Sequence, residues 1–241
     1  MIDWLFRQDM REPRIEVAGK VLPVVLRRNA QARRMTMRLA PDGTSVRITL
    51  PRWGRTAEAV AFAEERKGWL AGQLAAVPDP VSITPESTLP YRGDALPIRH
   101  DPLAPRRVRL VEGELHLGGA VDSLAPRLRR WLEGEARVLL EEDLAFYCER
   151  AARPLQRLML SNAQRRWGSC ARDGTVRINW RLVMAPEEVR RSVVAHEVAH
   201  LVHFDHSPGF HAMLAQLFEG DIRAANRWLK TEGRSLYHPF G

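Results

Sequence analysis

One segment of this sequence sets three titratable residues in an otherwise apolar run, which reads Val193-Val194-Ala195-His196-Glu197-Val198-Ala199-His200-Leu201-Val202. A run this apolar predicts a buried helix, so the side chains of His196, Glu197 and His200 need partners inside the protein. Positions four apart lie on one face of an α-helix, so the two imidazoles direct a nitrogen towards the same point. The segment therefore predicts a metal-binding helix around which the rest of the chain is organised.

The spacing of these residues is the H-E-x-x-H pattern of zinc sites. In that pattern two imidazoles bind the ion, and the glutamate handles the proton of a metal-bound water. Five of the eight histidines fall within one short stretch, at positions 196, 200, 203, 206 and 211. The alternative is a buried helix whose histidines are satisfied by hydrogen bonds. The clustering favours the metal site.

Length and composition indicate a globular protein. With 241 residues and 45% hydrophobic content, the chain is large enough for one domain or for a domain with a smaller module. It has no run of about 18 apolar residues, and its first residues lack the features of a signal peptide. We therefore expect a cytoplasmic protein without a membrane partner. Cys148 and Cys170 are too few for a disulfide framework, so we expect two free thiols.

The charge balance is basic. Lysine and arginine number 37 against 29 acidic residues, which gives a formal net charge of +8, and nearly all of the basic residues are arginine. Arginine binds phosphate bidentately, so nucleic acid is a partner to consider. The arginines are spread along the chain, often beside acids, which favours a compositional bias over a dedicated basic surface. A local basic group at Arg27, Arg28, Arg33 and Arg34 is the best candidate for an anion-binding surface.

The first half of the chain predicts a β-rich region. From Arg14 to Leu50 apolar and polar residues alternate, which predicts an antiparallel sheet with one buried face. Residues 55–77 predict one helix, and the prolines and hydroxyl residues near 78–90 predict a linker. A second set of strands follows at 96–117, with a turn at Glu112-Gly113-Glu114. We therefore expect residues 1–120 to form an N-terminal β-rich region with one helix.

The second half of the chain predicts the helices that surround the metal site. The longest runs from Ser123 to Ala152 and is expected to pack against the metal helix. A hairpin with a turn at Asp173-Gly174 leads into a strand over residues 175–182. Pro186 starts the metal helix, which breaks near Phe204, and Ser207 caps the next helix. A last short helix is expected at about 222–229.

Several of these segments together resemble the YgjP-like zinc metallopeptidase family, which is related to the SprT-like and WLM metallopeptidases. They are Arg166-Trp167-Gly168-Ser169-Cys170, Ile178-Asn179-Trp180-Arg181-Leu182, Ala185-Pro186, His196-Glu197-Val198-Ala199-His200 and His206-Ser207-Pro208. The resemblance implies an α+β fold in which residues 121–241 form a zincin-like metallopeptidase domain. It also implies a protein or peptide substrate, a catalytic Glu197, and one zinc ion bound by His196, His200 and His206.

The position of the third histidine can also be argued from helix geometry. His203 lies seven residues after His196, about 10.5 Å along a helix axis, which is too far for one tetrahedral ion to bind both. His206 follows the predicted helix break, so its chain is able to turn back towards the metal. His211 stands where the resembled family has an aromatic residue, and it could line the cleft as a hydrogen-bond donor. The residue that stabilises an oxyanion is left open among Arg166, His203, His211, Tyr237 and His238.

Two classes of function fit these patterns. The first is hydrolysis of peptide bonds by a zinc-activated water, with Glu197 as the general base. The second is a nucleic-acid-associated zinc protein, either a DNA-linked protease of SprT-like type or a binding module with structural zinc. Glu197 favours the first, because a closed structural site needs a fourth ligand and no acid beside it. In either case, we expect the segment from Arg166 to Cys170 and the strand of Asn179 to pack beside the metal helix.

Overall fold

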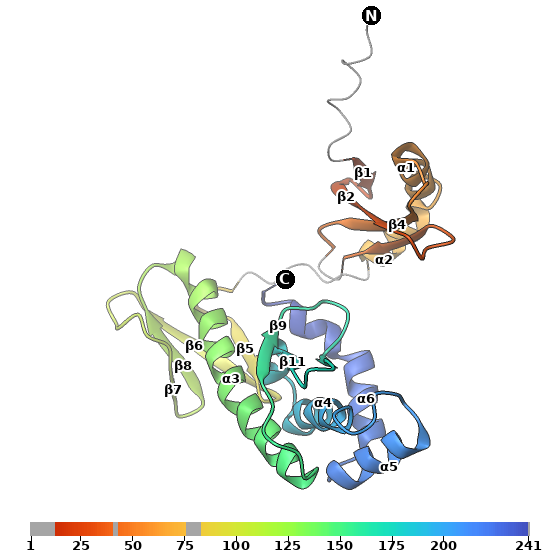
Figure 1. Ribbon diagram of the computed structural model, residues 1–241. Coiled ribbons are helices and arrows are strands. Elements are labelled where there is room, and N and C mark those ends of the chain that lie inside the picture. Colours follow the sequence, from red (N-terminus) through yellow and green to blue (C-terminus); the bar gives the residue numbers. More distant parts are fainter. Residues whose placement is uncertain (1–12, 41–42, 76–82, 241) are drawn as a thin grey trace, which may run out of the picture. The chain divides into compact units, whose positions relative to one another are not determined.

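The computed structural model describes residues 13–40, 43–75 and 83–240, which form two compact units (Figure 1). Unit 1 ends at Pro80 and unit 2 begins at Val81, whereas the sequence places the boundary at residue 120. The difference arises because strands between residues 88 and 118 contribute to the hydrophobic core of unit 2. Their buried side chains in that core are Leu89, Tyr91, Leu96, Ile98, Leu115 and Leu117.

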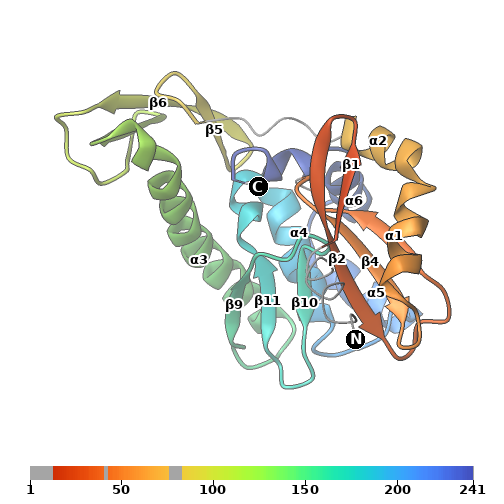
Figure 2. The same ribbon diagram turned by 90° about the horizontal axis from the view of Figure 1, so that it is seen from above.

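Unit 1 is a four-stranded sheet with helices on one face (Figure 2). Its elements are β1 (Arg14–Val17), β2 (Lys20–Asn29), β3 (Thr36–Leu39), β4 (Val46–Pro51), α1 (Thr56–Glu64) and α2 (Lys67–Ala75). The order is β1-β2-β4-β3, and β2 runs parallel to β4, so the sheet is mixed where the sequence predicts an antiparallel one. The single predicted helix at 55–77 is two helices. Periodicity does not reveal the break, because the buried Ala63 and Leu70 are seven residues apart and would share a face of one continuous helix.

Unit 2 begins with a second sheet of the same design. It contains β5 (Thr88–Tyr91), β6 (Asp94–Asp101), β7 (Arg109–Val111) and β8 (Glu114–Gly118), in the order β5-β6-β8-β7. As in unit 1, the second strand is parallel to the fourth, and the outer pairs are antiparallel. The part of the predicted linker at 78–82 lies outside the described residues, and residues 88–91 form β5. The two sheets therefore share one topology.

Sequence similarity accompanies this shared topology. Gly19-Lys20-Val21-Leu22-Pro23-Val24 matches Gly93-Asp94-Ala95-Leu96-Pro97-Ile98 at the glycine, leucine and proline. Both glycines have positive φ, +77° and +94°, and each follows a residue that also has positive φ. Two consecutive residues of this kind form the tight turn whose twist fits an antiparallel hairpin. The same turn thus opens both sheets.

A long helix is the largest element of unit 2. After a short turn at η2 (Val121–Ser123), α3 (Leu124–Arg150) occupies nearly the range that the sequence predicts. A three-stranded sheet follows, with β9 (Leu158–Ser161), β10 (Gly168–Cys170) and β11 (Val176–Asn179) in the order β10-β11-β9. The predicted strand at 175–182 ends early. Its last residue, Asn179, accepts a hydrogen bond from the backbone N–H of Arg181 at 3.1 Å and caps the next element, η3 (Trp180–Met184).

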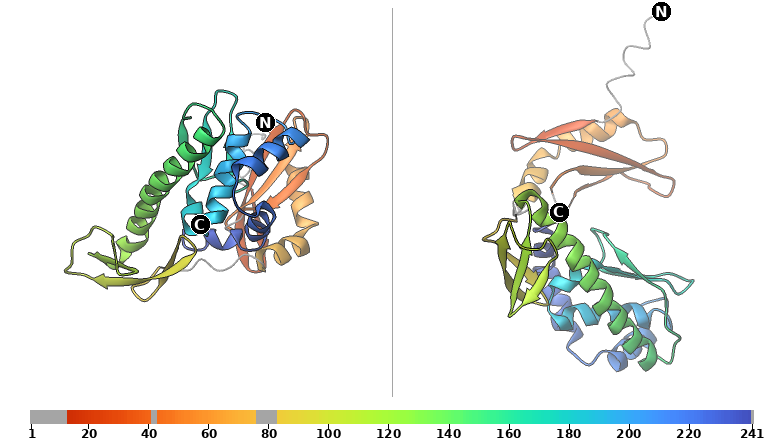
Figure 3. Two further views of the ribbon diagram at one scale, coloured as in Figure 1. Left: turned by 90° about the horizontal axis from the view of Figure 1, so that it is seen from below. Right: turned by 90° about the vertical axis from the view of Figure 1, so that its left-hand side faces the viewer.

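The remaining elements are helical: α4 (Glu187–Ala199), α5 (Pro208–Leu217), α6 (Ile222–Thr231) and η4 (Gly233–Tyr237). The central one is α4, which contacts α3, α5, α6, η3, β10 and β11 (Figures 1 and 3). Its buried Arg190 pairs with the buried Asp143 of α3 at 2.7 Å, which fixes the two helices together. The arrangement confirms the packing of the longest helix against the helix that carries His196 and His200.

The described residues confirm a mixed α+β fold. Both cysteines are free, and Cys148 is buried in the core as a small apolar side chain. Among the described helices, none is both long and apolar enough to cross a membrane.

Candidate metal centre

The helix α4 carries two of the candidate ligands near its C-terminal end. Most of its side chains are buried. His196, in its last turn, and His200, at its C-cap, are half-buried. The helix ends at Ala199 because the chain turns, and Ser207 then caps α5 by accepting a hydrogen bond from the N–H of Phe210. His206 lies in this connection between α4 and α5, one residue before the cap. The chain therefore turns back after α4 and brings a third imidazole close to that helix.

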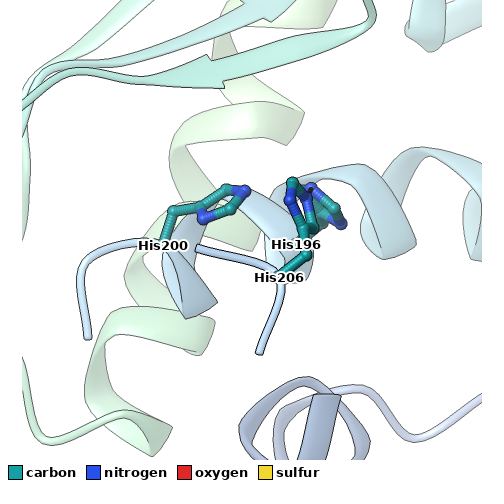
Figure 4. Close-up of side chains that lie close together, drawn as sticks. All are labelled: His196, His200 and His206. Carbon is teal, nitrogen blue, oxygen red and sulfur yellow. Dashed lines mark hydrogen bonds between the residues drawn. The ribbon is translucent and has the colours of Figure 1, made fainter. Parts of the chain in front are cut away.

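The three imidazoles converge on one point (Figure 4). One nitrogen from each of His196, His200 and His206 lies within 4.8 Å of the other two, and the Nε2 atoms of His196 and His206 are 3.4 Å apart. Two nitrogens bound to a tetrahedral zinc ion at about 2.05 Å are separated by roughly 3.3 Å. The observed separations therefore fit a metal ion after small rotations of one ring.

A hydrogen bond orients the second imidazole. The Nδ1 atom of His200 lies 2.9 Å from the backbone oxygen of His203, which accepts its proton. This bond assigns the tautomer and leaves the Nε2 lone pair free for a metal. His203 thus contributes its carbonyl group, while its own ring is not part of the cluster.

The aromatic ring of Phe210 supports all three histidines. It is fully buried, and its centroid lies 4.9, 4.5 and 4.8 Å from those of His196, His200 and His206. A rigid ring beneath the cluster limits the rotation of the imidazoles, which is the kind of preorganisation a metal site needs. In the sequence, Phe210 has only the spacing of an apolar core residue in the helix after Ser207.

The surroundings of His196 favour its neutral form. Burial, together with the neighbouring His200, His206 and His211, lowers the pKa of His196 to about 4. The imidazole of His196 is therefore unprotonated near neutral pH in the metal-free protein. Metal binding needs the deprotonated form, so no proton has to be displaced from this ligand.

The carboxyl group of Glu197 is buried against the edge strand β10. Burial raises its pKa to about 7, while Arg166 and a hydrogen bond from the backbone N–H of Cys170 lower it in part. Gly168 allows this approach, because a Cβ atom at that position would lie 2.4 Å from Oε1 of Glu197. Among the described residues, no group forms a hydrogen bond with the buried Oε2 atom. A buried polar atom without a hydrogen-bond partner requires an explanation, and one explanation is that the group takes part in a reaction.

The segment before β10 is held by the C-terminal end of the chain. Trp167 packs on Tyr237 with ring centroids 5.7 Å apart, and a Cβ atom on Gly233 would lie 2.9 Å from the indole ring. The side-chain amide of Asn179 donates to the backbone oxygen of Ala163 at 2.9 Å. These contacts fix the loop that leads into Gly168. Of the segments expected beside the helix of His196, β10 (residues 168–170) and the strand of Asn179, β11, contact α4.

The other candidate residues have different positions. The hydroxyl of Tyr237 lies 3.1 Å from the backbone oxygen of Ala163, to which it donates, so it has a structural role. His211 is exposed on α5, outside the cluster, although its charge influences the pKa of His196. The exposed Arg166 is the candidate whose charge reaches Glu197. His238 is half-buried, with an unpartnered Nε2 atom among the described residues.

Comparison with protein families assigns the chain. Residues 33–232 match the model of the YgjP-like family, described as the YgjP-like metallopeptidase domain. The chain belongs to this family. The match includes all of the histidine cluster, Glu197 and the strand β10, and it confirms the resemblance that the sequence motifs indicate. The YgjP-like match also begins within unit 1, so the family is not confined to the unit that contains the cluster.

Among solved structures, this YgjP-like protein is similar to the crystal structure of the metallopeptidase zymogen of Pyrococcus abyssi abylysin. The similarity has a TM-score of 0.34 and 18% sequence identity, and it covers 41% of this chain and 96% of that chain. Comparison with curated proteins gave no match.

The roles of two residues near the histidine cluster, Gly168 and Phe210, cannot be predicted from the sequence. Gly168 is one glycine in the segment from Arg166 to Cys170, and its contact with Glu197 is made between residues 29 positions apart. Phe210 has the spacing of an ordinary core residue. A single sequence reveals neither role, because both depend on how α4, α5 and β10 pack.

Proposed function

We propose that this protein is a zinc-dependent peptidase with a zincin-like site, in which His196, His200 and His206 hold one ion and Glu197 is the general base. The observation that supports it best is the convergence of three imidazole nitrogens within 4.8 Å, next to a buried carboxylate. Three protein ligands leave one position of a tetrahedral ion open, as in catalytic zinc sites. A structural site would need a fourth ligand, and among the described residues the cluster has three members.

A zinc ion held by His196, His200 and His206 would act as a Lewis acid, which polarises a carbonyl group and lowers the pKa of a bound water to near 7. The Oε2 atom of Glu197 accepts the proton of the attacking water and later delivers it to the leaving amine. The hydrogen bond from the backbone N–H of Cys170 and the packing against Gly168 hold the carboxylate in one orientation. Arg166 lies near enough to influence this carboxylate and is the candidate to stabilise the developing oxyanion.

The substrate in this proposal is an extended peptide. The strand β10 is at the edge of its sheet, with β11 on its other side. An exposed edge offers backbone groups to an added strand, which is a common mode of peptide recognition. A peptide that pairs with residues 168–170 would lie beside Glu197, because Gly168 contacts that side chain.

The test compares two glutamine variants of the same helix. Glu197→Gln preserves the shape of the side chain and removes its basicity, so we expect cleavage of a fluorescent casein substrate to fall by about 10²- to 10⁴-fold. Glu188→Gln is the control, because Glu188 is exposed in the first turn of α4 and should not affect the rate. Both variants should keep zinc. Equal cleavage by Glu197→Gln and the wild type would refute the mechanism.

A further inference from the structure

A concave site separate from the histidine cluster lies in unit 2, on the sheet formed by β5 to β8 and the adjoining part of α3. The cavity has a volume of about 540 Å³ and is lined by Arg106, Arg107, Val108, Arg127, Arg130, Trp131 and Glu135. None of these residues belongs to the histidine cluster. The volume falls within the usual range of small-molecule sites.

The lining combines two parts of the chain. Arg106 and Arg107 lie between β6 and β7, in the loop that crosses the end of the sheet. Arg127, Arg130 and Trp131 lie on α3 at positions i, i+3 and i+4, which share one face of a helix. Four guanidinium groups and an indole ring therefore surround one space.

The positive charge of this pocket exceeds the negative charge in its lining, which holds four arginines and one glutamate. Among the described residues, none of the four arginines forms an ion pair, whereas other arginines of α3 do so with the residue four positions later, as in Arg129–Glu133 and Arg137–Glu141. The residue four positions after Arg127 is Trp131, and after Arg130 it is Gly134. The one carboxylate in the lining, Glu135, accepts a hydrogen bond from the hydroxyl of Tyr91 at 2.7 Å. An anion from outside the chain would supply the missing negative charge.

Part of the pocket is preorganised. Arg127 is half-buried and donates from Nη1 to the backbone oxygen of Gly118. A Cβ atom on Gly119 would lie 2.8 Å from both Nη atoms of Arg127 and 3.2 Å from Cγ of Arg106, so the two side chains meet over this glycine. A ligand with several negative oxygens would accept paired hydrogen bonds from guanidinium groups placed around one space.

The side chain of Trp131 indicates which class of anionic ligand fits the pocket. Trp131 is half-buried and rests on Tyr91, with ring centroids 5.0 Å apart. An indole fixed in this way beside guanidinium groups provides a surface for a planar base, and such stacking is a common source of affinity for nucleotides. An inorganic anion would use only the arginines.

The arginine pair recurs in unit 1. Arg33-Arg34-Met35 occupies the loop between β2 and β3, and Arg106-Arg107-Val108 occupies the loop between β6 and β7. Because the two sheets have the same strand order, these loops are topologically equivalent. The arginine pair is therefore a feature of the repeated sheet, and in unit 2 it meets a helix that supplies two more arginines and the tryptophan.

We propose that the pocket of Arg106, Arg107, Arg127, Arg130 and Trp131 binds a nucleotide, with its phosphates on the arginines and its base against Trp131. The nucleotide is either free or part of a single-stranded nucleic acid, since both carry the same phosphate and base. This site is independent of the peptidase proposal and contains none of its residues.

The experiment measures binding to the intact zinc-loaded protein at about 50 mM salt. Titration calorimetry with ADP and with inorganic pyrophosphate is combined with fluorescence anisotropy of a labelled twelve-nucleotide oligothymidylate. We expect ADP or the oligonucleotide to bind, and the double variant Arg107→Gln/Arg130→Gln to weaken that binding by about tenfold or more. Tighter binding of the oligonucleotide with a steep salt dependence would identify a strand as the source, whereas tighter binding of ADP would identify a free nucleotide.

Matched variants separate this site from general charge effects. Arg223→Gln/Arg227→Gln removes two exposed positive charges from α6 and should bind as the wild type does. Trp131→Phe should retain ADP binding, and Trp131→Leu should lose affinity for ADP while keeping affinity for pyrophosphate. Undetectable binding of all three ligands, or equal losses in the pocket variant and the α6 variant, would overturn the proposal. So would unchanged binding in the pocket variant, because the phosphates would then be held elsewhere.

Discussion

Replacing Gly168 by alanine should impair catalysis without removing the metal. The backbone of Gly168 is extended within β10 and pairs with Ile178, so alanine is compatible with its conformation. The new Cβ atom would lie 2.4 Å from Oε1 of Glu197, 2.7 Å from its Cγ atom and 2.8 Å from its Cδ atom. The effect of the substitution should therefore pass through the Glu197 side chain.

The expected size follows from these distances. Non-bonded carbon and oxygen atoms approach to about 3.3 Å, so the carboxylate must move by roughly 0.9 Å. A displacement of about 1 Å in a reacting group costs on the order of 100-fold in rate, equivalent to about 2.7 kcal/mol. We expect kcat/KM for a peptide substrate to fall by about this factor, mainly through kcat.

The assay pairs steady-state kinetics with metal analysis, and Gly134→Ala is the control. Gly134 lies in α3, and a Cβ atom there would meet no atom within 4 Å. That variant should keep full activity and gain about 0.5–1 kcal/mol of stability, as alanine does in an exposed helix. Full activity in Gly168→Ala with its metal retained would refute the reasoning. Loss of the metal in that variant would also count against it, because the change would then extend beyond Glu197.

Three further predictions concern the metal, the core and the thiols. Removing the metal should lower the melting temperature by roughly 5–10 °C relative to protein at a free zinc concentration about 100 times the Kd, and identical melting curves would argue against a native-state site. Arg190→Met should lower the free energy of unfolding by about 3 kcal/mol, because it leaves the buried Asp143 without its nearest partner, and a loss below about 1 kcal/mol in denaturant titrations would contradict this. Burial raises the pKa of Cys170 to about 11, so in a Cys148→Ala variant its reaction with Ellman's reagent should be slow at pH 8 and rise with pH, whereas the rate of an unperturbed thiol at pH 8 would show that Cys170 is accessible.

The sequence predicts the helices of unit 2 well, because their signals are local. Pro186 before α4 and Ser207 before α5 are start signals that act within one turn, and both helices begin where those residues indicate. The break that brings His206 back to the cluster follows from the same signals. Spacing and resemblance therefore predict the same three histidines that the structure brings close together.

Long-range pairing was harder to predict. Alternation in β2 and β4 indicates strands, yet nothing local states that they run parallel, since that depends on β3 passing to the far side of β4. The sequence predicts a linker near residues 78–90 but assigns the strands after it to the N-terminal region, for a similar reason. Leu89, Leu115 and Leu117 look like any buried strand residues, and only the packing assigns them to the core that contains α3.

The central claim is that His206, and neither His203 nor His211, completes the metal site. Zinc content measured by mass spectrometry after dialysis of the wild type and three single alanine variants tests it most directly. We expect about one ion per chain in the wild type, in His203→Ala and in His211→Ala, because His203 acts through its backbone carbonyl and His211 lies outside the cluster. His206→Ala should lose the ion. Retention of zinc by His206→Ala, or its loss from either of the other two variants, would contradict the account.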